Sequence, residues 1–276
     1  MLGIIMFFCI GKINYAAPSR QTPLTISFIN VGQGDSILVQ TPNNHTMLID
    51  AGVMAAEPKI IYYLNSNHIS RIDALVATNT HKNHIGGIQT LIYTFPVARI
   101  YLPNISSRTV FYQETLASIK TKRLPSFASR AGTFINIDPS LIIEILAPLK
   151  DHYLKSGDYS TVIKITYDKT SVLFMGDVGQ VSEREMLKAK YHLHADVLKV
   201  GRHGSVGATT EKFLKAVSPV YAIISVGANN KYGFPNQETL QKLKMAGVKL
   251  YRTDINGTIK ITSDGKKVSV YPERIN

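Results

Sequence analysis

The spacing of apolar and polar residues predicts two groups of β-strands, each followed by strands that alternate with helices. The first group contains short strands at 24–29, 36–40 and 46–50, separated by tight polar turns. The second begins with 160–167 and 171–175, which a two-residue turn joins. This repeated plan indicates an α+β fold in which two mixed sheets pack face to face, with helices on their outer sides.

The remaining apolar runs complete this pattern. We expect helices near 58–66, 85–93, 109–121, 181–189, 211–217 and 237–246. Further strands are expected at 74–78, 97–102, 141–146, 196–200, 221–226 and 249–252, with a basic loop at 123–129. Asn256-Gly257 and Asp264-Gly265 read as hairpin turns between the last strands. No linker or change of composition divides residues 24–276, so we expect one domain there.

Four of the expected strands end in polar side chains that can bind a metal ion. They stop at Asp50, at the cluster 79–84, at Asp177 and at His203. Strand ends on the same edge of two packed sheets meet, so His81, His84, Asp177 and His203 form a candidate nitrogen and oxygen site for zinc or manganese. Taken singly, each is also consistent with an ordinary turn or loop residue. The repeated arrangement favours the metal site.

The first residues resemble an export signal. Residues 2–11 are apolar but too short to cross a bilayer, and small residues suited to cleavage follow at Ala16-Ala17. We therefore expect a signal peptide at 1–17, a polar leader at 18–23 and a periplasmic or secreted protein. A disordered or mis-started N-terminus is the alternative, because no Lys or Arg precedes the apolar run.

The chain is strongly basic, and this property bears on its partners. Its 276 residues include 31 Lys and Arg against 19 Asp and Glu, a formal net charge of +12. Such a charge favours polyanionic partners, namely nucleic acid, phosphorylated substrates such as another phosphodiester, or an anionic membrane surface, or it serves solubility alone. The sequence gives no oligomeric state, and no transmembrane segment is expected after residue 17.

Several ordered motifs resemble the metallo-β-lactamase superfamily, and in particular the hydrolase domain of DNA-uptake competence proteins of the ComEC type. The resemblance covers roughly 24–272 and implies a four-layer αββα sandwich. The segments that carry it are Val31–Ser36, Leu48–Gly52, Thr78–Gly87, Phe174–Asp177, Lys199–Ser205, Gly227–Pro235 and Arg252–Thr258.

The resemblance implies one or two zinc ions, with manganese as the alternative, and it also shows a damaged motif. Asn79 stands where the family signature has its first histidine, and Asn83 stands where it has an aspartate that binds metal and orients the attacking water. Arg202 replaces the first of two paired histidines, and Phe234 replaces a histidine before the proline. Asn79 and Asn83 are thus weak metal ligands, since an amide carries no charge.

The resemblance also suggests roles around the metal ligands. It gives catalytic roles to positions 83 and 177, and it makes Asp50 a partner that orients a ligand histidine. Lys82, Arg202 and Ser205 are candidates for binding phosphate, with Lys199 beside them. A basic track could continue through residues that on their own read as a solvated face: Lys120, Lys122, Arg123 and Arg130.

Three functions are consistent with these residues. The first is an exported metal-dependent hydrolase, a phosphodiesterase or nuclease that acts on nucleic acid with a partly degraded site. The second is a weak or inactive relative that binds nucleic acid or another phosphorylated ligand without cleaving it. The third is hydrolysis of a small ester, lactone or lactam, which the basic charge disfavours.

Overall fold

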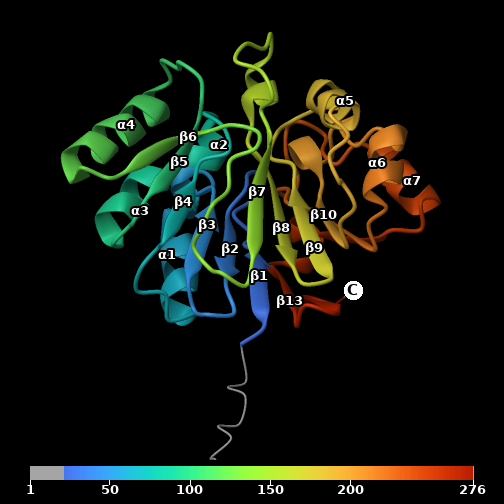
Figure 1. The fold of residues 1–276 in the computed structure, drawn as a ribbon, viewed down its shortest axis with the longest axis horizontal. Coiled ribbons are helices and arrows are strands. Elements are labelled where there is room, and N and C mark those ends of the chain that lie inside the picture. Colours follow the sequence, from blue (N-terminus) through green and yellow to red (C-terminus); the bar gives the residue numbers. More distant parts are fainter. Residues whose placement is uncertain (1–21, 276) are drawn as a thin grey trace, which may run out of the picture.

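Two mixed β-sheets form the centre of the computed structural model, which describes residues 22–275 (Figure 1). The larger sheet has eight strands in the order β14-β13-β1-β2-β3-β4-β5-β6. Adjacent strands are antiparallel from β14 to β3 and parallel from β3 to β6. The strand bounds are β1 Leu24–Phe28, β2 Ile37–Gln40, β3 Thr46–Ile49, β4 Ala74–Val76, β5 Ile100–Pro103, β6 Ser126–Ser129, β13 Ile259–Ser263 and β14 Val268–Pro272.

The second sheet repeats this plan with six strands in the order β12-β11-β10-β9-β8-β7. An antiparallel meander, β7 to β9, leads into parallel strands, β9 to β12. The expectation of two mixed sheets is therefore confirmed. The bounds are β7 Ile142–Ala147, β8 Val162–Tyr167, β9 Thr170–Phe174, β10 Val197–Lys199, β11 Tyr221–Ile224 and β12 Lys249–Arg252.

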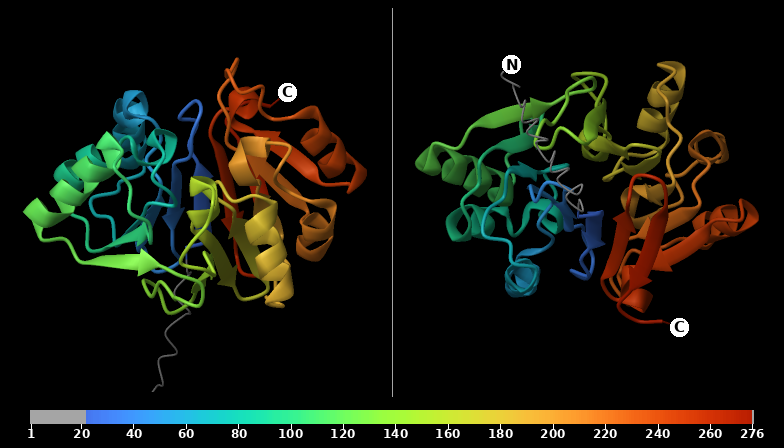
Figure 2. Two further views of the ribbon diagram at one scale, coloured as in Figure 1. Left: turned by 90° about the horizontal axis from the view of Figure 1, so that it is seen from above. Right: turned by 60° about the horizontal axis from the view of Figure 1, so that its bottom comes forward.

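Helices cover the outer face of each sheet (Figures 1 and 2). The eight-stranded sheet packs against α1 Glu57–Ser66, α3 Ile88–Thr94 and α4 Val110–Lys122. The six-stranded sheet packs against α5 Gln180–Lys188, α6 Glu211–Val217 and α7 Gln237–Met245. The short elements are α2 Lys82–Ile85, α8 Thr253–Asn256 and three 3-10 turns, η1 Met54–Ala56, η2 Ser156–Tyr159 and η3 Gly201–Gly204.

The hydrophobic core has three layers, as a four-layer sandwich requires. In β2, Ile37 and Val39 point between the two sheets, whereas Leu38 points toward the helices. Because inner strands such as β2 and β4 alternate in this way and are buried on both faces, nearly all of their positions are apolar. A third layer lies between the six-stranded sheet and its helices, around Leu173 and Phe213. The αββα architecture is confirmed.

Three local expectations differ from the structure. The basic loop at 123–129 contains edge strand β6, which pairs in parallel with β5 and whose Phe127 ring stacks on Tyr101. The helix expected at 85–93 is two helices, because α2 ends at Ile85 and α3 begins at Ile88. Between them, residue 86 is a glycine because a Cβ there would lie 2.5 Å from the backbone nitrogen of Met54. Asn256-Gly257 ends α8 and carries the chain from the second sheet back to the first.

The expected signal peptide and most of the leader lie outside the described residues. Within the described part of the chain, no helix combines the length and apolar character needed to span a bilayer.

Candidate metal centre

The strand ends that the sequence singles out meet at one edge of the two sheets. Asp50 follows β3, and the segment 78–84 follows β4 in the larger sheet. Asp177 follows β9, and His203 lies in η3 after β10 in the smaller sheet. Residues separated by more than 100 positions in sequence therefore come within contact distance, as the order of apolar runs predicts.

His84 is fully buried, and a carboxylate fixes its orientation. Its Nδ1 lies 2.7 Å from Oδ2 of Asp50. The same Asp50 carboxylate accepts hydrogen bonds from the backbone N–H of Thr78 at 2.7 Å and from its hydroxyl at 2.6 Å. With Nδ1 held in this way, Nε2 of His84 faces the centre of the site. Asp50 thus has the orienting position that the sequence predicts for it.

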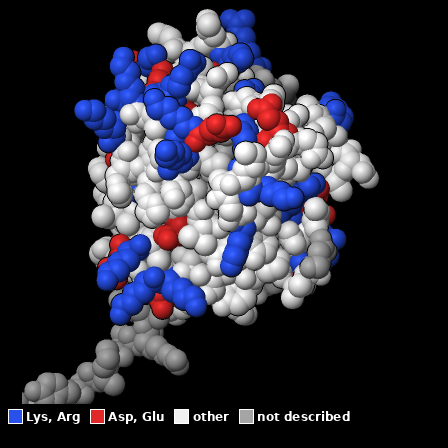
Figure 3. Space-filling model, turned by 90° about the vertical axis from the view of Figure 1, so that its right-hand side faces the viewer, with Lys and Arg blue, Asp and Glu red and all other residues white. Residues whose placement is uncertain are grey.

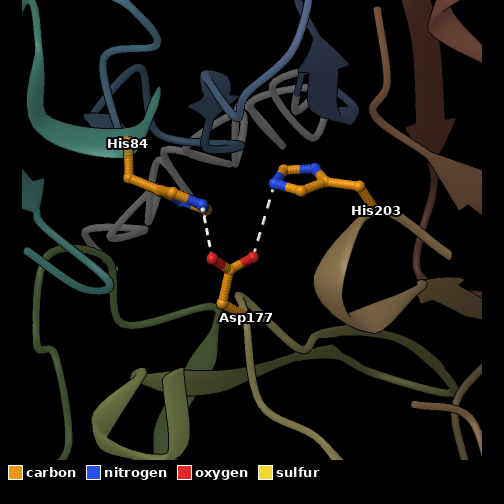
Figure 4. A group of neighbouring side chains, drawn as sticks. All are labelled: His84, Asp177 and His203. Carbon is orange, nitrogen blue, oxygen red and sulfur yellow. Dashed lines mark ion pairs between the residues drawn. The ribbon is translucent and has the colours of Figure 1, made fainter. Parts of the chain in front are cut away.

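Asp177 lies between two imidazoles, as Figure 4 shows. Its Oδ2 is 3.2 Å from Nε2 of His84, and its Oδ1 is 3.4 Å from Nε2 of His203. Nε2 of His84 and Oδ1 of Asp177 are nevertheless buried without a hydrogen-bond partner. Two imidazole nitrogens and a carboxylate, all within 4.8 Å of one another, fit a divalent cation such as zinc.

His203 presents a lone pair to this centre, and Asn83 approaches that lone pair. Nδ1 of His203 donates to the carbonyl oxygen of Ser225 at 2.8 Å, so Nε2 of the neutral ring carries no proton. The Asn83 amide nitrogen lies 3.0 Å from this Nε2 and donates to it. An ion at Nε2 of His203 would therefore have to displace the Asn83 amide nitrogen.

Burial and neighbouring charges shift the pKa values of all three buried groups. Burial lowers the pKa of His84, but Asp177 and Asp50 outweigh it and raise this pKa well above the ordinary value. Burial raises the pKa of Asp177, yet His84 and His203 hold it well below its usual range. For His203 burial prevails and lowers the pKa. Asp177 is thus an anion, and a metal ion would satisfy the same groups.

His81 and Asn79 lie at the border of the centre. Nδ1 of His81 is 3.2 Å from Oδ2 of Asp177, and its Nε2 is 2.8 Å from the hydroxyl of Ser156. The Asn79 side-chain oxygen accepts from the backbone N–H of His81 at 2.8 Å. Both residues are brought to the site, but their donor atoms are largely occupied by neighbouring protein groups.

The sequence reasoning missed a buried ion pair below this centre. Lys199 and Asp35 are both buried and joined by a direct salt bridge. Lys199 therefore cannot reach a phosphate, contrary to our expectation. Gly34 precedes Asp35 and lies against the Asn83 backbone: a Cβ there, at φ +154°, would lie 2.2 Å from the carbonyl oxygen of Asn83. The sequence does place a charged residue at or next to the end of each of two strands, Asp35 and Lys199, but nothing in it shows that these two residues pair.

The candidate phosphate-binding residues have different positions. Lys82 and Arg202 line a cleft of about 520 Å³ that opens onto His81, Asn83, Asp177 and His203. Ser205 is buried outside this lining. Arg130 forms an ion pair with Asp151, and Lys122 lies over the ring of Tyr93.

Three residues of the site adopt left-handed backbone conformations. The φ values of Asp50, Arg202 and His203 are 60°, 47° and 53°. Such conformations cost about 1–3 kcal/mol each for non-glycine residues and concentrate at functional sites. These three residues and the buried metal-binding atoms lie together at the strand ends of a four-layer αββα protein, and they mark a candidate metal centre there.

The chain belongs to the metallo-β-lactamase superfamily. The sequence model of that superfamily matches residues 29–228, which is more than half of the chain. This result confirms the resemblance drawn from the motifs, and it makes the protein a member of a hydrolase superfamily with potential metal ligands in place.

Curated relatives include competence proteins. The chain is 30% identical over 266 residues to ComE operon protein 3 of Bacillus subtilis, covering 90% of this chain and 34% of that protein. It is 30% identical over 255 residues to competence protein ComA of Neisseria gonorrhoeae, covering 91% and 34%. The chain spans about a third of the length of these relatives. The resemblance to competence proteins is confirmed.

Solved structures share the fold. CmlA, a diiron beta-hydroxylase from Streptomyces venezuelae, superposes with a TM-score of 0.54 at 11% identity, covering 86% of this chain and 53% of that chain. At such low identity the likeness concerns the fold alone.

Proposed function

We propose that this protein is a metal-dependent phosphodiesterase that hydrolyses nucleic acid, with zinc or manganese as its ion. One observation carries the proposal. Nε2 of His84, Nε2 of His203 and the Asp177 carboxylate converge at a cleft that two cationic side chains also line. Metal-binding donors beside cationic groups are the combination that phosphoryl transfer requires.

The residues around the ion have distinct tasks. His84, Asp177 and His203 would hold it, and the ion supplies a Lewis acid that polarises a phosphoryl oxygen and acidifies water. Asp50 and the Ser225 carbonyl keep the two imidazoles in the tautomer that exposes Nε2. Lys82 and Arg202 would bind the non-bridging phosphate oxygens.

The donors support one ion rather than two. The outward nitrogen of His81 faces Ser156, and the oxygen of Asn79 faces the His81 backbone. A second acidic cluster of Asp35, Asp50 and His84 already contains a cation, because Lys199 is bound to Asp35. Among the described residues, His84, Asp177 and His203 form the other group with metal-ligand spacing.

Arg202 supplies positive charge on the His81 side of Asp177. Its guanidinium reaches the glycines at 157 and 179, and a Cβ on Gly179 would lie 3.5 Å from one of its nitrogens. Asp177 is the carboxylate that borders the same cleft. A guanidinium has five N–H groups that can donate hydrogen bonds to a phosphate, and it does so without binding the metal ion. This side chain would therefore stabilise charge that develops on the phosphoryl group.

One observation favours a second function, the binding of phosphorylated ligands without cleavage. The Asn83 amide donates to His203 Nε2, the atom that a metal ion would need. If that hydrogen bond persists, the cleft still offers Lys82 and Arg202 to a polyanion. The surface charge is compatible with either function, since Figure 3 shows Lys and Arg spread widely over the helix-covered face of the second sheet.

Metal analysis of the purified protein separates the two functions. If the protein is an enzyme, it should contain about one zinc or manganese per chain and should cleave single-stranded DNA. His84→Ala should abolish both, whereas the exposed His192→Ala is the matched control and should change neither. If the protein stays metal-free in zinc-containing buffer and leaves the strand intact, it lacks the proposed phosphodiesterase activity. It is the binding protein if the strand still binds in a salt-dependent manner.

We further propose that the protein is exported and acts in the periplasm or outside the cell. The apolar run at 2–11 and the small residues at Ala16-Ala17 motivate this proposal. The intact mass of protein recovered from the periplasmic fraction should correspond to cleavage near Ala17. Recovery of the full-length chain from the cytoplasm alone would contradict export.

A further inference from the structure

An aromatic pair forms part of the cleft beside the metal centre. The rings of Tyr232 and Phe234 stack with centroids 5.6 Å apart and planes inclined by 17°. Tyr232 is 54% exposed, and the Nζ of Lys231 lies over its ring, so a base that stacks there displaces this exposed ammonium. Phe111, at the start of α4, lines the same cleft from the other half of the chain.

The loop that carries these rings is held in shape by one side chain. The Asn230 side-chain oxygen accepts from the backbone N–H of Tyr232 at 3.2 Å and of Phe234 at 3.1 Å. Its nitrogen donates to the carbonyl oxygens of Gly227 at 3.0 Å and of Phe234 at 2.6 Å. These four hydrogen bonds position the stacked rings before any ligand arrives, so less conformational entropy is lost on binding.

Cationic groups surround the aromatic pair. Nζ of Lys231 lies 5.4 Å from the centroid of the Tyr232 ring. Lys82 and Arg202 line the cleft with the rings, and neither has an ion-pair partner among residues 22–275. Stacking surfaces next to a basic groove are the features by which proteins bind single-stranded nucleic acid.

We propose that Tyr232 and Phe234 form a base-stacking subsite for a nucleotide of single-stranded nucleic acid whose phosphodiester lies at the metal centre. This inference rests on the proposed function, because it places the phosphate next to Lys82 and Arg202. In a duplex the bases stack on one another and offer no free face, so the subsite selects single strands. Every base has a π-face, so the subsite tolerates any sequence.

A binding experiment with and without bases tests the subsite. The full chain in EDTA is titrated into a fluorescent oligodeoxythymidylate of about ten nucleotides, and into an abasic strand with the same phosphates. The affinity of the native protein for the strand with bases should exceed its affinity for the abasic strand by about 5- to 150-fold. This is the ratio expected from the stacking of one base. Tyr232→Ala should lose this preference and keep its affinity for the abasic strand.

Two further variants sharpen the result. Tyr232→Phe keeps the stacking face and should retain the preference, whereas Tyr62→Ala removes an aromatic ring that is 73% exposed on α1 and should change nothing. Equal binding of both strands by the native protein overturns the subsite but leaves the proposed function standing. If Tyr232→Ala weakens the binding of both strands equally, the subsite is also overturned, and the proposed function still stands. Binding of neither strand in EDTA also overturns the subsite, whereas the metal content and the cleavage assay decide the proposed function separately.

Discussion

The side-chain nitrogen of Asn83 lies 3.0 Å from Nε2 of His203 and donates a hydrogen bond to it. A neutral amide thereby satisfies the lone pair that a metal ion would otherwise bind. A metal ion bound at this nitrogen would compete with the hydrogen bond from Asn83. Residue 83 would then affect how tightly the ion is held as well as the charge of the centre.

Asn83→Asp should strengthen metal binding at least about tenfold, equivalent to about 1.4 kcal/mol. The carboxylate cannot donate to His203, and it adds a negative charge beside the cation. Competition against a chromophoric zinc chelator at pH 7 measures the change. Asn83→Ala separates the two effects, because it removes the amide without adding charge. Unchanged affinity in both variants would show that Asn83 does not restrict the centre.

Asp50→Asn should weaken metal binding by about 10- to 100-fold, the usual effect of losing the partner that orients a ligand histidine. Asp50 is fully buried and holds Nδ1 of His84 at 2.7 Å. An amide can donate to Nδ1 and so favour the tautomer in which Nε2 of His84 carries the proton. The same chelator competition gives the affinity. Asp264→Asn, in the exposed β13–β14 turn, is the control and should bind as the native chain does.

Lys199→Met should reduce the free energy of unfolding by about 3–5 kcal/mol, because it leaves the Asp35 carboxylate buried and unpaired. The double variant Asp35→Asn/Lys199→Met removes both charges and should recover most of the loss. Urea denaturation in EDTA measures all four members of the cycle. Arg71→Met breaks an exposed ion pair with Asp73 and should cost less than about 1 kcal/mol. A double variant as unstable as Lys199→Met would mean that the ion pair is not the cause.

Asp138 should make stability depend on pH. Burial raises its pKa, but hydrogen bonds from Ser140, Thr41 and Asn43 outweigh burial and lower the pKa well below the ordinary value. The stabilisation is therefore complete above the unfolded pKa of about 3.9 and is lost as pH falls through the folded value. Asp138→Asn should cost about 1–3 kcal/mol at pH 7, and the gap should narrow below about pH 4. A gap in the urea midpoints that is independent of pH would exclude this linkage.

The sequence predicts the centre well where adjacent residues carry the information. Apolar runs that stop at Asp50, Asp177 and His203 indicate strand ends on one edge, and the structure brings them together. The resemblance to the metallo-β-lactamase superfamily suggests that Asp50 orients a histidine, and Oδ2 of Asp50 lies 2.7 Å from Nδ1 of His84. Strand ends are readable because burial on both faces makes the strands continuously apolar.

The buried ion pair between Asp35 and Lys199 was not predictable from the sequence. Asp35 and Lys199 are 164 residues apart, and each has the character of a polar turn or motif residue when read alone. Edge strand β6 was missed because Ser126–Ser129 is short and its burial pattern is mostly exposed. Its strand conformation depends on pairing with β5, which is a tertiary effect.

The return of the chain from the second sheet to the first has a consequence for folding during synthesis. β13 pairs with β1 along its whole length, and nearby Asn30 and Thr258 bond across 228 residues of sequence. While a ribosome makes the chain, β1 has an unpaired edge until Ile259 and Ile261 emerge to join the core between the sheets. The nascent first sheet is therefore open to incorrect pairing, and its completion waits for the final strands.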